Sequence, residues 1–281
     1  MIEYIIIAIF QGLFEWLPIS SSGQTMIISI NLFGISPENA FSLAIWLHLG
    51  TMFAVLLKFK NDFIRLFKSL FHSNLEVNIV DVKKRNWLIY ATIGTGITAI
   101  PIYFIIKIII LDAFTAFQGD ILTLVISGFL ILTGIILIKM RRIYGTNKIS
   151  DVSESRVKRD SFLSGLTQGV SILPGISRSG ITMSAILLQK YEQNDALLLS
   201  FMMSVPVTIA SLAVDILFGK GSVFGTLDVV TIIIVTLVSF IIGYLTIDIL
   251  LRLARNLNFG YFCVLYGVLA YVFILPFLII A

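Results

Sequence analysis

The chain has little charge and almost no cysteine. Its one cysteine, Cys263, excludes an internal disulfide and lies in an apolar run, which indicates a small buried side chain rather than a reactive thiol. Charged residues make up 13% of the 281 residues, against about 25% in soluble domains. The sequence contains no Walker loop, dinucleotide fingerprint or cluster of metal ligands. It therefore gives no sign of nucleotide chemistry or of a disulfide-stabilised fold.

Apolar residues dominate what is present. They make up 58% of the chain, and the mean hydropathy is +1.00. A protein with several membrane-spanning helices needs such a composition, and a soluble domain does not tolerate it. We therefore predict an all-α integral membrane protein with a single membrane domain over residues 1–281. No Lys or Arg precedes the first apolar run and no small-residue cleavage site closes it before Pro18, so the N-terminus is expected to be retained.

Six stretches are long and apolar enough to cross a bilayer core of roughly 30 Å. Two further apolar segments, at about 4–33 and 161–189, are each divided near the middle by proline and Ser/Gly residues. Each half is too short to cross alone, so we predict six transmembrane helices and two re-entrant helical hairpins. The expected spans lie at 40–57, 87–110, 121–138, 197–217, 228–251 and 260–280.

Basic residues indicate which loops face the cytoplasm. Residues 58–86 and 139–160 carry seven Lys or Arg each, which is fourteen of the twenty in the chain. Because Lys and Arg are retained on the cytoplasmic side, both loops are predicted there. Segments 34–39 and 111–120, which have no Lys or Arg, fall outside. The net charge of +4 follows from this topology and gives no indication of nucleic-acid binding.

One segment occurs twice in related form. Phe10–Met26 reads FQGLFEWLPISSSGQTM and Thr167–Met183 reads TQGVSILPGISRSGITM. Both copies interrupt a helix inside an apolar stretch, and paired interruptions of this kind mark a site within a membrane protein. An odd number of spans separates them, so residues 1–138 and 161–281 are predicted to be inverted repeats joined by a basic cytoplasmic loop. The two Ser/Gly tips would then meet within the membrane.

The tips carry groups that suit an anion. Each tip precedes an apolar helical run, so it offers hydroxyls and unpaired N–H groups at a helix N-terminus, where the dipole favours negative charge. Arg178 adds donors that match phosphate oxygens. An ion pair with Glu15 is the alternative for Arg178, and the two roles are compatible. We expect an anionic ligand, with phosphate as the best candidate.

Glu15 is the one acidic residue in the interior of either hairpin. It follows Gln11 by one helical turn, so both side chains project from the same face toward the serine cluster. A carboxylate there could act as a general base on a serine hydroxyl or a water, or could hold a divalent cation against the phosphate. The sequence leaves both roles open.

Two motifs resemble the signatures of a known family. Gln11–Gly23 resembles the first signature of the bacitracin-resistance type undecaprenyl-diphosphate phosphatases, and Pro174–Thr182 resembles the second. The resemblance extends over the whole chain. It implies hydrolysis of a polyprenyl diphosphate, undecaprenyl or dolichol-type, to the monophosphate and inorganic phosphate, which recycles the lipid carrier of cell-envelope glycan synthesis. It also implies a multi-pass cell-membrane protein whose active site opens to the outer face.

The resemblance assigns roles to individual residues. Glu15 matches a catalytic carboxylate, Ser21 a nucleophile or phosphate ligand, and Arg178 a phosphate clamp. A divalent cation, Mg²⁺ or Ca²⁺, is expected because the diphosphate needs more positive charge than one arginine supplies, and its protein ligands are not identified. The expected substrate-binding residues are Gln11, Ser20, Ser22, Gly23, Gln24, Ser177, Ser179, Gly180 and Thr182.

The chain departs from the family pattern at two positions. Gln11 stands where the first signature has a second glutamate, and Gln24 stands where it has a histidine. His48 occupies a position where many members carry glutamine, so one hypothesis is that His48 supplies the catalytic imidazole instead. A hydrogen-bonded packing role is the alternative for His48.

A different class of function also fits the pattern. Inverted repeats with interrupted helices are typical of secondary transporters, so a flippase for a polyprenyl phosphate is the alternative to hydrolysis. Both functions imply a lipid substrate and the bilayer as partners. The sequence leaves the oligomeric state open, with a homodimer as one alternative.

Overall fold

Long helices form wherever the sequence is apolar over a membrane-spanning length. The computed structural model describes residues 1–71, 78–112, 118–140, 145–218, 223–256 and 259–280. Within these residues, five helices are long and apolar enough to cross a membrane, so the chain is a multi-pass membrane protein. They are α3 (Pro37–Lys58), α5 (Ile79–Asp112), α6 (Gln118–Met140), α9 (Gln193–Phe218) and α11 (Val229–Asn256).

These five helices coincide with five of the six expected spans. The sixth, at 260–280, coincides with α12 (Phe259–Ile280), whose apolar stretch over Phe259–Leu275 is shorter than the others. The largest difference between an expected span boundary and an observed helix boundary is at the start of α5, which begins at Ile79 rather than near residue 87. Polar residues continue the helix there beyond its apolar part, so hydropathy alone places the boundary too late.

Two helix pairs are interrupted at the predicted tips. The first pair is α1 (Ile2–Phe14) and α2 (Ser21–Asn31). The second is α7 (Glu154–Gly169) and α8 (Arg178–Leu188), with the short 3-10 helix η1 (Val170–Ile172) between them. The hairpin expected from residue 161 in fact begins at Glu154, because the hydroxyl of Ser153 caps α7 by accepting a hydrogen bond from the N–H of Arg156 at 3.4 Å.

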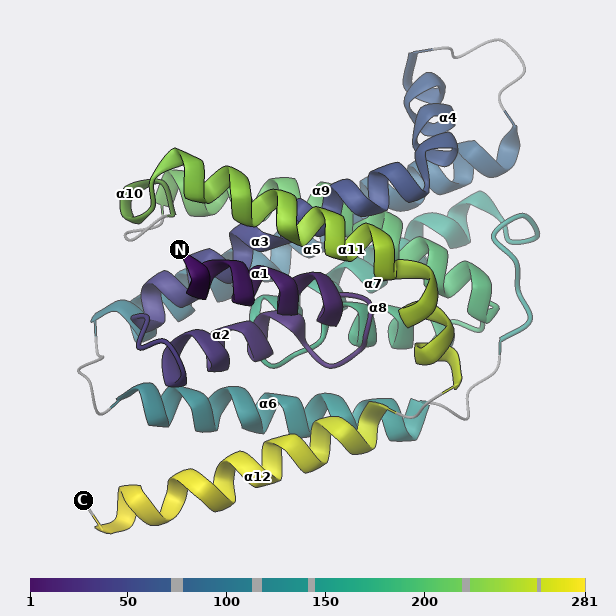
Figure 1. Cartoon of the computed structure of the whole chain (residues 1–281). Coiled ribbons are helices and arrows are strands. Elements are labelled where there is room, and N and C mark those ends of the chain that lie inside the picture. Colours follow the sequence, from purple (N-terminus) through teal and green to yellow (C-terminus); the bar gives the residue numbers. More distant parts are fainter. Residues whose placement is uncertain (72–77, 113–117, 141–144, 219–222, 257–258, 281) are drawn as a thin grey trace.

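The helices pack around the two interrupted pairs (Figure 1). α6 lies between α2 and α12, α7 packs along α5, and α1 packs against α3 and α11. α4 (Lys60–Phe71) projects from one end, and the short α10 (Val223–Thr226) precedes α11 at the other. Many large apolar side chains on the outer helices are exposed, as contact with lipid requires.

A tryptophan beside the first interruption fixes its position. Trp16 is 1% exposed, and its indole N–H donates to the carbonyl of Gly243 on α11 at 3.0 Å. Its ring packs against Phe201 of α9, with centroids 5.6 Å apart. Because Glu15 directly precedes Trp16, these contacts anchor the segment that follows α1 to α9 and α11.

The two tips approach each other through glycine. A Cβ built on Gly23 would lie 2.8 Å from the backbone N of Gly175, so the first tip tolerates no side chain there. Gly175 has a φ of +99°, and a Cβ on it would lie 2.3 Å from the carbonyl oxygen of Ile126. Both positions require glycine, and Gly175 requires it for backbone conformation as well as space.

We expect Gly175→Ala to destabilise the fold by on the order of 2–4 kcal/mol, because it combines backbone strain with overpacking. The thermal unfolding midpoint of the purified protein in detergent measures the effect. Gly225→Ala is the matched control, because a Cβ at Gly225 meets no atom within 4 Å. Equal midpoints for the two variants would contradict the account of the tip.

Candidate active site

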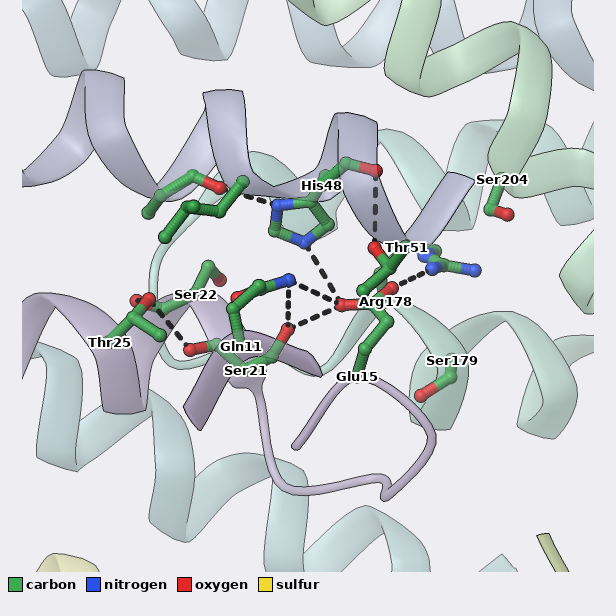
Figure 2. Close-up of polar contacts among 12 residues, drawn as sticks. Gln11, Glu15, Ser21, Ser22, Thr25, His48, Thr51, Arg178, Ser179 and Ser204 are labelled. Atoms are coloured by element: carbon green, nitrogen blue, oxygen red, sulfur yellow. Dashed lines mark hydrogen bonds and ion pairs between the residues drawn. The ribbon is translucent and has the colours of Figure 1, made fainter. Parts of the chain in front are cut away.

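The carboxylate of Glu15 is the centre of the site (Figure 2). Arg178 Nη2 pairs with its Oε1. Ser21 Oγ donates to Oε2 at 2.6 Å, Gln11 Nε2 donates to the same oxygen at 2.9 Å, and His48 Nε2 lies 3.2 Å from it. The Glu15 side chain is only 4% exposed, so these contacts replace the water that a buried charge has lost.

Two helix N-termini converge on this carboxylate. Ser21 is the first residue of α2 and Arg178 is the first residue of α8. Each helix begins with a capping serine: Ser20 Oγ accepts from the N–H of Gly23 at 3.4 Å, and Ser177 Oγ accepts from the N–H of Gly180 at 3.2 Å. The positive ends of both helices therefore add to Arg178 in favouring an anion.

Ser20 also ties the two tips together. Its hydroxyl accepts a second hydrogen bond, at 3.1 Å, from the N–H of Gly175 in the other hairpin. Its φ of 60° lies in the left-handed region, a conformation that costs a non-glycine residue free energy. The bond to Gly175 offsets part of that cost and sets how far apart Ser21 and Arg178 lie.

A cavity of about 170 Å³ opens beside Glu15. Its remaining wall comes mainly from apolar or small residues of α5, such as Ala99 and Ile100, and from α9 residues such as Val207 and Val214. One end is thus charged and the wall is mostly apolar, which suits an anionic headgroup with an apolar tail. The sequence-predicted residues that line it are Glu15, Ser20, Ser21, Ser22, His48, Ser177, Arg178 and Ser179.

The other predicted residues lie outside the cavity lining. Gln11 contacts Glu15 directly, but Gln24 is 3% exposed and its amide donates to the carbonyl of Ile19 at 3.4 Å. Thr182 is fully buried and donates to Gln168 at 3.4 Å. Gly23 and Gly180 lie at the starts of α2 and α8 and do not line the cavity. Gly23 packs closely against the backbone of Gly175, and Gly180 packs against the side chains of Ser177 and Pro18.

Several lining residues were not singled out from the sequence. Gln168 lines the cavity, is 1% exposed and donates to Thr95 Oγ1 at 3.0 Å. Its position in the repeated segment, aligned with Gln11, was the available signal. Ser204 and Thr208 line the cavity from α9, and their spacing of one helical turn was a weaker signal. Ser204 lies on the Arg178 side of the site (Figure 2).

A cation at this site would need ligands from the substrate. In the part of the chain that the structure describes, no three His, Cys, Asp or Glu side chains gather in one place. Glu15 is the one carboxylate in the cavity lining. Mg²⁺ is often held by one or two carboxylates together with phosphate oxygens, so the residues fit an ion that arrives with a phosphorylated ligand.

Fold and site define a class: a multi-pass helical membrane protein with a buried carboxylate–guanidinium pair at two helix N-termini, beside a largely apolar cavity. Comparison with known families makes this specific. The chain belongs to the family described as bacitracin resistance protein BacA, whose model matches residues 4–272. This confirms the resemblance seen in the two motifs.

Named relatives align over nearly the whole chain. The undecaprenyl-diphosphatase of Methanothrix thermoacetophila is 37% identical over 268 residues, which cover 95% of this chain and 94% of the relative. That of Methanococcoides burtonii is 37% identical over 275 residues, covering 95% and 96%. That of Methanopyrus kandleri is 35% identical over 268 residues, covering 95% and 93%. All three relatives are named for hydrolysis and not for transport.

Proposed function

We propose that this protein hydrolyses a polyprenyl diphosphate, of the undecaprenyl or dolichol type, to the monophosphate and inorganic phosphate. Such a reaction recycles the lipid carrier used in cell-envelope glycan synthesis. The observation that carries the proposal is the contact set of Glu15, in which a hydroxyl, a guanidinium and an imidazole meet one buried carboxylate. Family membership and the names of the relatives support the same reaction.

In the proposed reaction, the terminal phosphate lies between the two helix N-termini. Arg178 and the hydroxyls of Ser177 and Ser179 hold its oxygens. Glu15 takes a proton from Ser21 or from a water, and that oxygen attacks the terminal phosphorus. The hydrogen bond of 2.6 Å from Ser21 Oγ to Glu15 supports this assignment. Stabilisation of the phosphoryl oxygens by Arg178 and the helix N-termini supplies most of the rate enhancement.

The proposed topology has six spans and two re-entrant hairpins in inverted repeat. Among the described residues, α5 leads away from the basic loop at 58–86. The cavity is lined by the part of α5 up to Tyr103 and by α9 up to Val214, so it extends away from the side of the basic loops. Because basic loops stay in the cytoplasm, this supports an active site that opens to the outer face.

We expect chelation with EDTA to lower phosphate release, and Mg²⁺ or Ca²⁺ to restore it. The diphosphate oxygens would hold the ion, and its chemistry would be charge neutralisation on the phosphoryl oxygens. The measurement is the rate of phosphate release by purified protein before chelation, after it, and after each cation is added back. A rate that stays unchanged after thorough chelation would contradict the cation's role.

Phosphate release from a C55 polyprenyl diphosphate by purified protein in detergent tests the proposed function. A soluble short-chain diphosphate is the matched control, and the apolar cavity wall predicts slower turnover of it. We expect release from the long-chain lipid that depends on Glu15 and Arg178. Binding of the lipid without release, together with movement of polyprenyl phosphate across vesicles, would instead support the transporter.

A further inference from the structure

The ring of His48 faces a hydrogen-bond acceptor at each nitrogen. Nδ1 lies 2.6 Å from the carbonyl oxygen of Ala44, and a carbonyl oxygen only accepts, so Nδ1 carries a proton. Nε2 lies 3.2 Å from Glu15 Oε2. A neutral imidazole has one N–H, which is here at Nδ1. The lone pair of Nε2 would then face a lone pair of Glu15 Oε2, which is repulsive. A further proton must therefore lie between Nε2 and the carboxylate.

The surroundings of Glu15 place that proton on the imidazole. Glu15 Oε2 accepts hydrogen bonds from Ser21 and Gln11, while its other oxygen pairs with Arg178. Each of these contacts requires an acceptor, as an ionised carboxylate provides. In this state His48 is an imidazolium ion that shares one carboxylate with Arg178. Glu15 and Arg178 are the other charged side chains among the cavity-lining residues, and the second contact of the ring, the carbonyl of Ala44, is uncharged.

The Glu15 carboxylate therefore occupies the position beside Arg178 and His48 in which an anionic ligand could bind. The His48 side chain is 20% exposed and lines the cavity, so a ligand can reach it. A phosphate group that enters the cavity competes with Glu15 for both Arg178 and His48, because phosphate oxygens accept the same hydrogen bonds. The exchange would release Glu15 to act as a base and would turn the His48 proton toward the substrate.

We propose that His48 is the general acid of the reaction and donates its Nε2 proton to the leaving group. This deepens the proposed function and rests on it. As the attacking oxygen bonds to the terminal phosphorus, its proton passes to Glu15. The bond from that phosphorus to the bridging oxygen breaks, its electron pair stays on the bridging oxygen, and that oxygen takes the proton from His48. If water attacks, transfer of the proton from Glu15 back to His48 across their contact restores the starting state. If Ser21 attacks, a water must then cleave the Oγ–P bond of the phosphoserine, and one of its protons returns to Ser21 through Glu15.

The other ionisable groups of the cavity are unsuited to this role. Arg178 does not give up a proton in proteins. Tyr103 lines the cavity, but its hydroxyl already donates to Asp215 at 3.4 Å. Gln24, which stands where the family has a histidine, lies outside the cavity lining, has no transferable proton and donates to the carbonyl of Ile19. Among the described lining residues, His48 is the remaining acid beside Glu15.

His48→Gln is the sharpest test, because the glutamine amide can still donate to Glu15 but carries no transferable proton. We expect kcat for phosphate release to fall about 10²–10³-fold, with KM little changed. A purely structural role for His48 would be kept by the glutamine, and the rate would then stay near that of the wild type.

Thr51→Val is the matched control on the same helix. Its hydroxyl donates to the backbone carbonyl of His48 at 3.1 Å, so the variant disturbs the helix beside the ring and leaves the imidazole in place. We expect its rate to stay within about threefold of the wild type. Thermal unfolding and lipid binding show whether each variant is folded, and His48→Asn replaces His48→Gln if the latter does not fold.

The outcomes separate this proposal from the one on which it rests. If the wild type and His48→Gln release phosphate at rates within about threefold, the acid role is overturned and the phosphatase stands. If the wild type releases no phosphate from the lipid, the proposed function fails and the acid role fails with it. A lower kcat for His48→Gln, with Thr51→Val near the wild-type rate, supports both.

Discussion

Replacing Arg178 with alanine should lower phosphate release by about 10³-fold or more, the effect typical of an arginine that stabilises a transferring phosphoryl group. Arg178 is the one arginine or lysine among the described residues that line the cavity, and its side chain is 14% exposed. The same change removes the guanidinium partner of the buried Glu15 carboxylate and leaves His48 as its other cation. We expect a loss of stability smaller than the roughly 3–5 kcal/mol that follows when a buried charge loses its one partner. Initial rates and thermal unfolding of the same preparations measure the two effects.

Arg178→Lys separates charge from geometry. Lysine keeps the positive charge but loses the planar pair of donors that matches phosphate oxygens, so we expect an intermediate loss of about 10–10²-fold. Lys158→Ala is the control at an exposed site, where the side chain is 44% exposed and pairs with Glu154 at 3.7 Å. Its rate should match the wild type. Near-normal turnover by Arg178→Ala would remove Arg178 from the reaction.

Glu15→Gln should lower kcat by about 10³-fold, because the amide has the shape of the carboxylate but cannot accept a proton. The same change should tighten the binding of inorganic phosphate and of lipid monophosphate. Glu15 no longer competes with these anions for Arg178 and His48, both of which contact it directly. A lower kcat together with stronger product binding is a combination that simple unfolding does not produce.

Equilibrium binding of lipid monophosphate and initial rates measure the two effects of Glu15→Gln. Asp248→Asn is the matched control, because Asp248 is a 58% exposed carboxylate that pairs with Lys58 at 2.5 Å. We expect that variant to keep both the rate and the affinity. Unchanged turnover in Glu15→Gln, or weaker phosphate binding, would contradict the role of Glu15 as both base and competitor.

The sequence predicts the features that depend on local patterns. Hydropathy locates the long helices, and the repeated segment locates the two interruptions, because proline and Ser/Gly residues end a helix inside an apolar run. The capped helix starts at Ser20 and Ser177 follow from the same residues. Helix ends set by polar residues are less predictable, as the early starts of α5 and α7 show.

Features that depend on packing between distant segments are not readable from the sequence. The resemblance implied substrate contact for Gln24, yet its amide turns back to Ile19 and lies outside the cavity lining. His48 was a hypothesis based on a departure from the family pattern, and only the packing of α3 against the first hairpin shows that it reaches Glu15. The hydroxyls of Ser204 and Thr208 are at the cavity because α9 packs beside Arg178.

A single turnover of polyprenyl diphosphate in H₂¹⁸O tests the central claim most directly. Attack on the terminal phosphorus makes lipid monophosphate the leaving group. Inorganic phosphate should therefore carry the ¹⁸O label and lipid monophosphate none, and Glu15→Gln should form neither product on the same timescale. Label in the lipid monophosphate, or label in inorganic phosphate from Glu15→Gln at the wild-type rate, would contradict it.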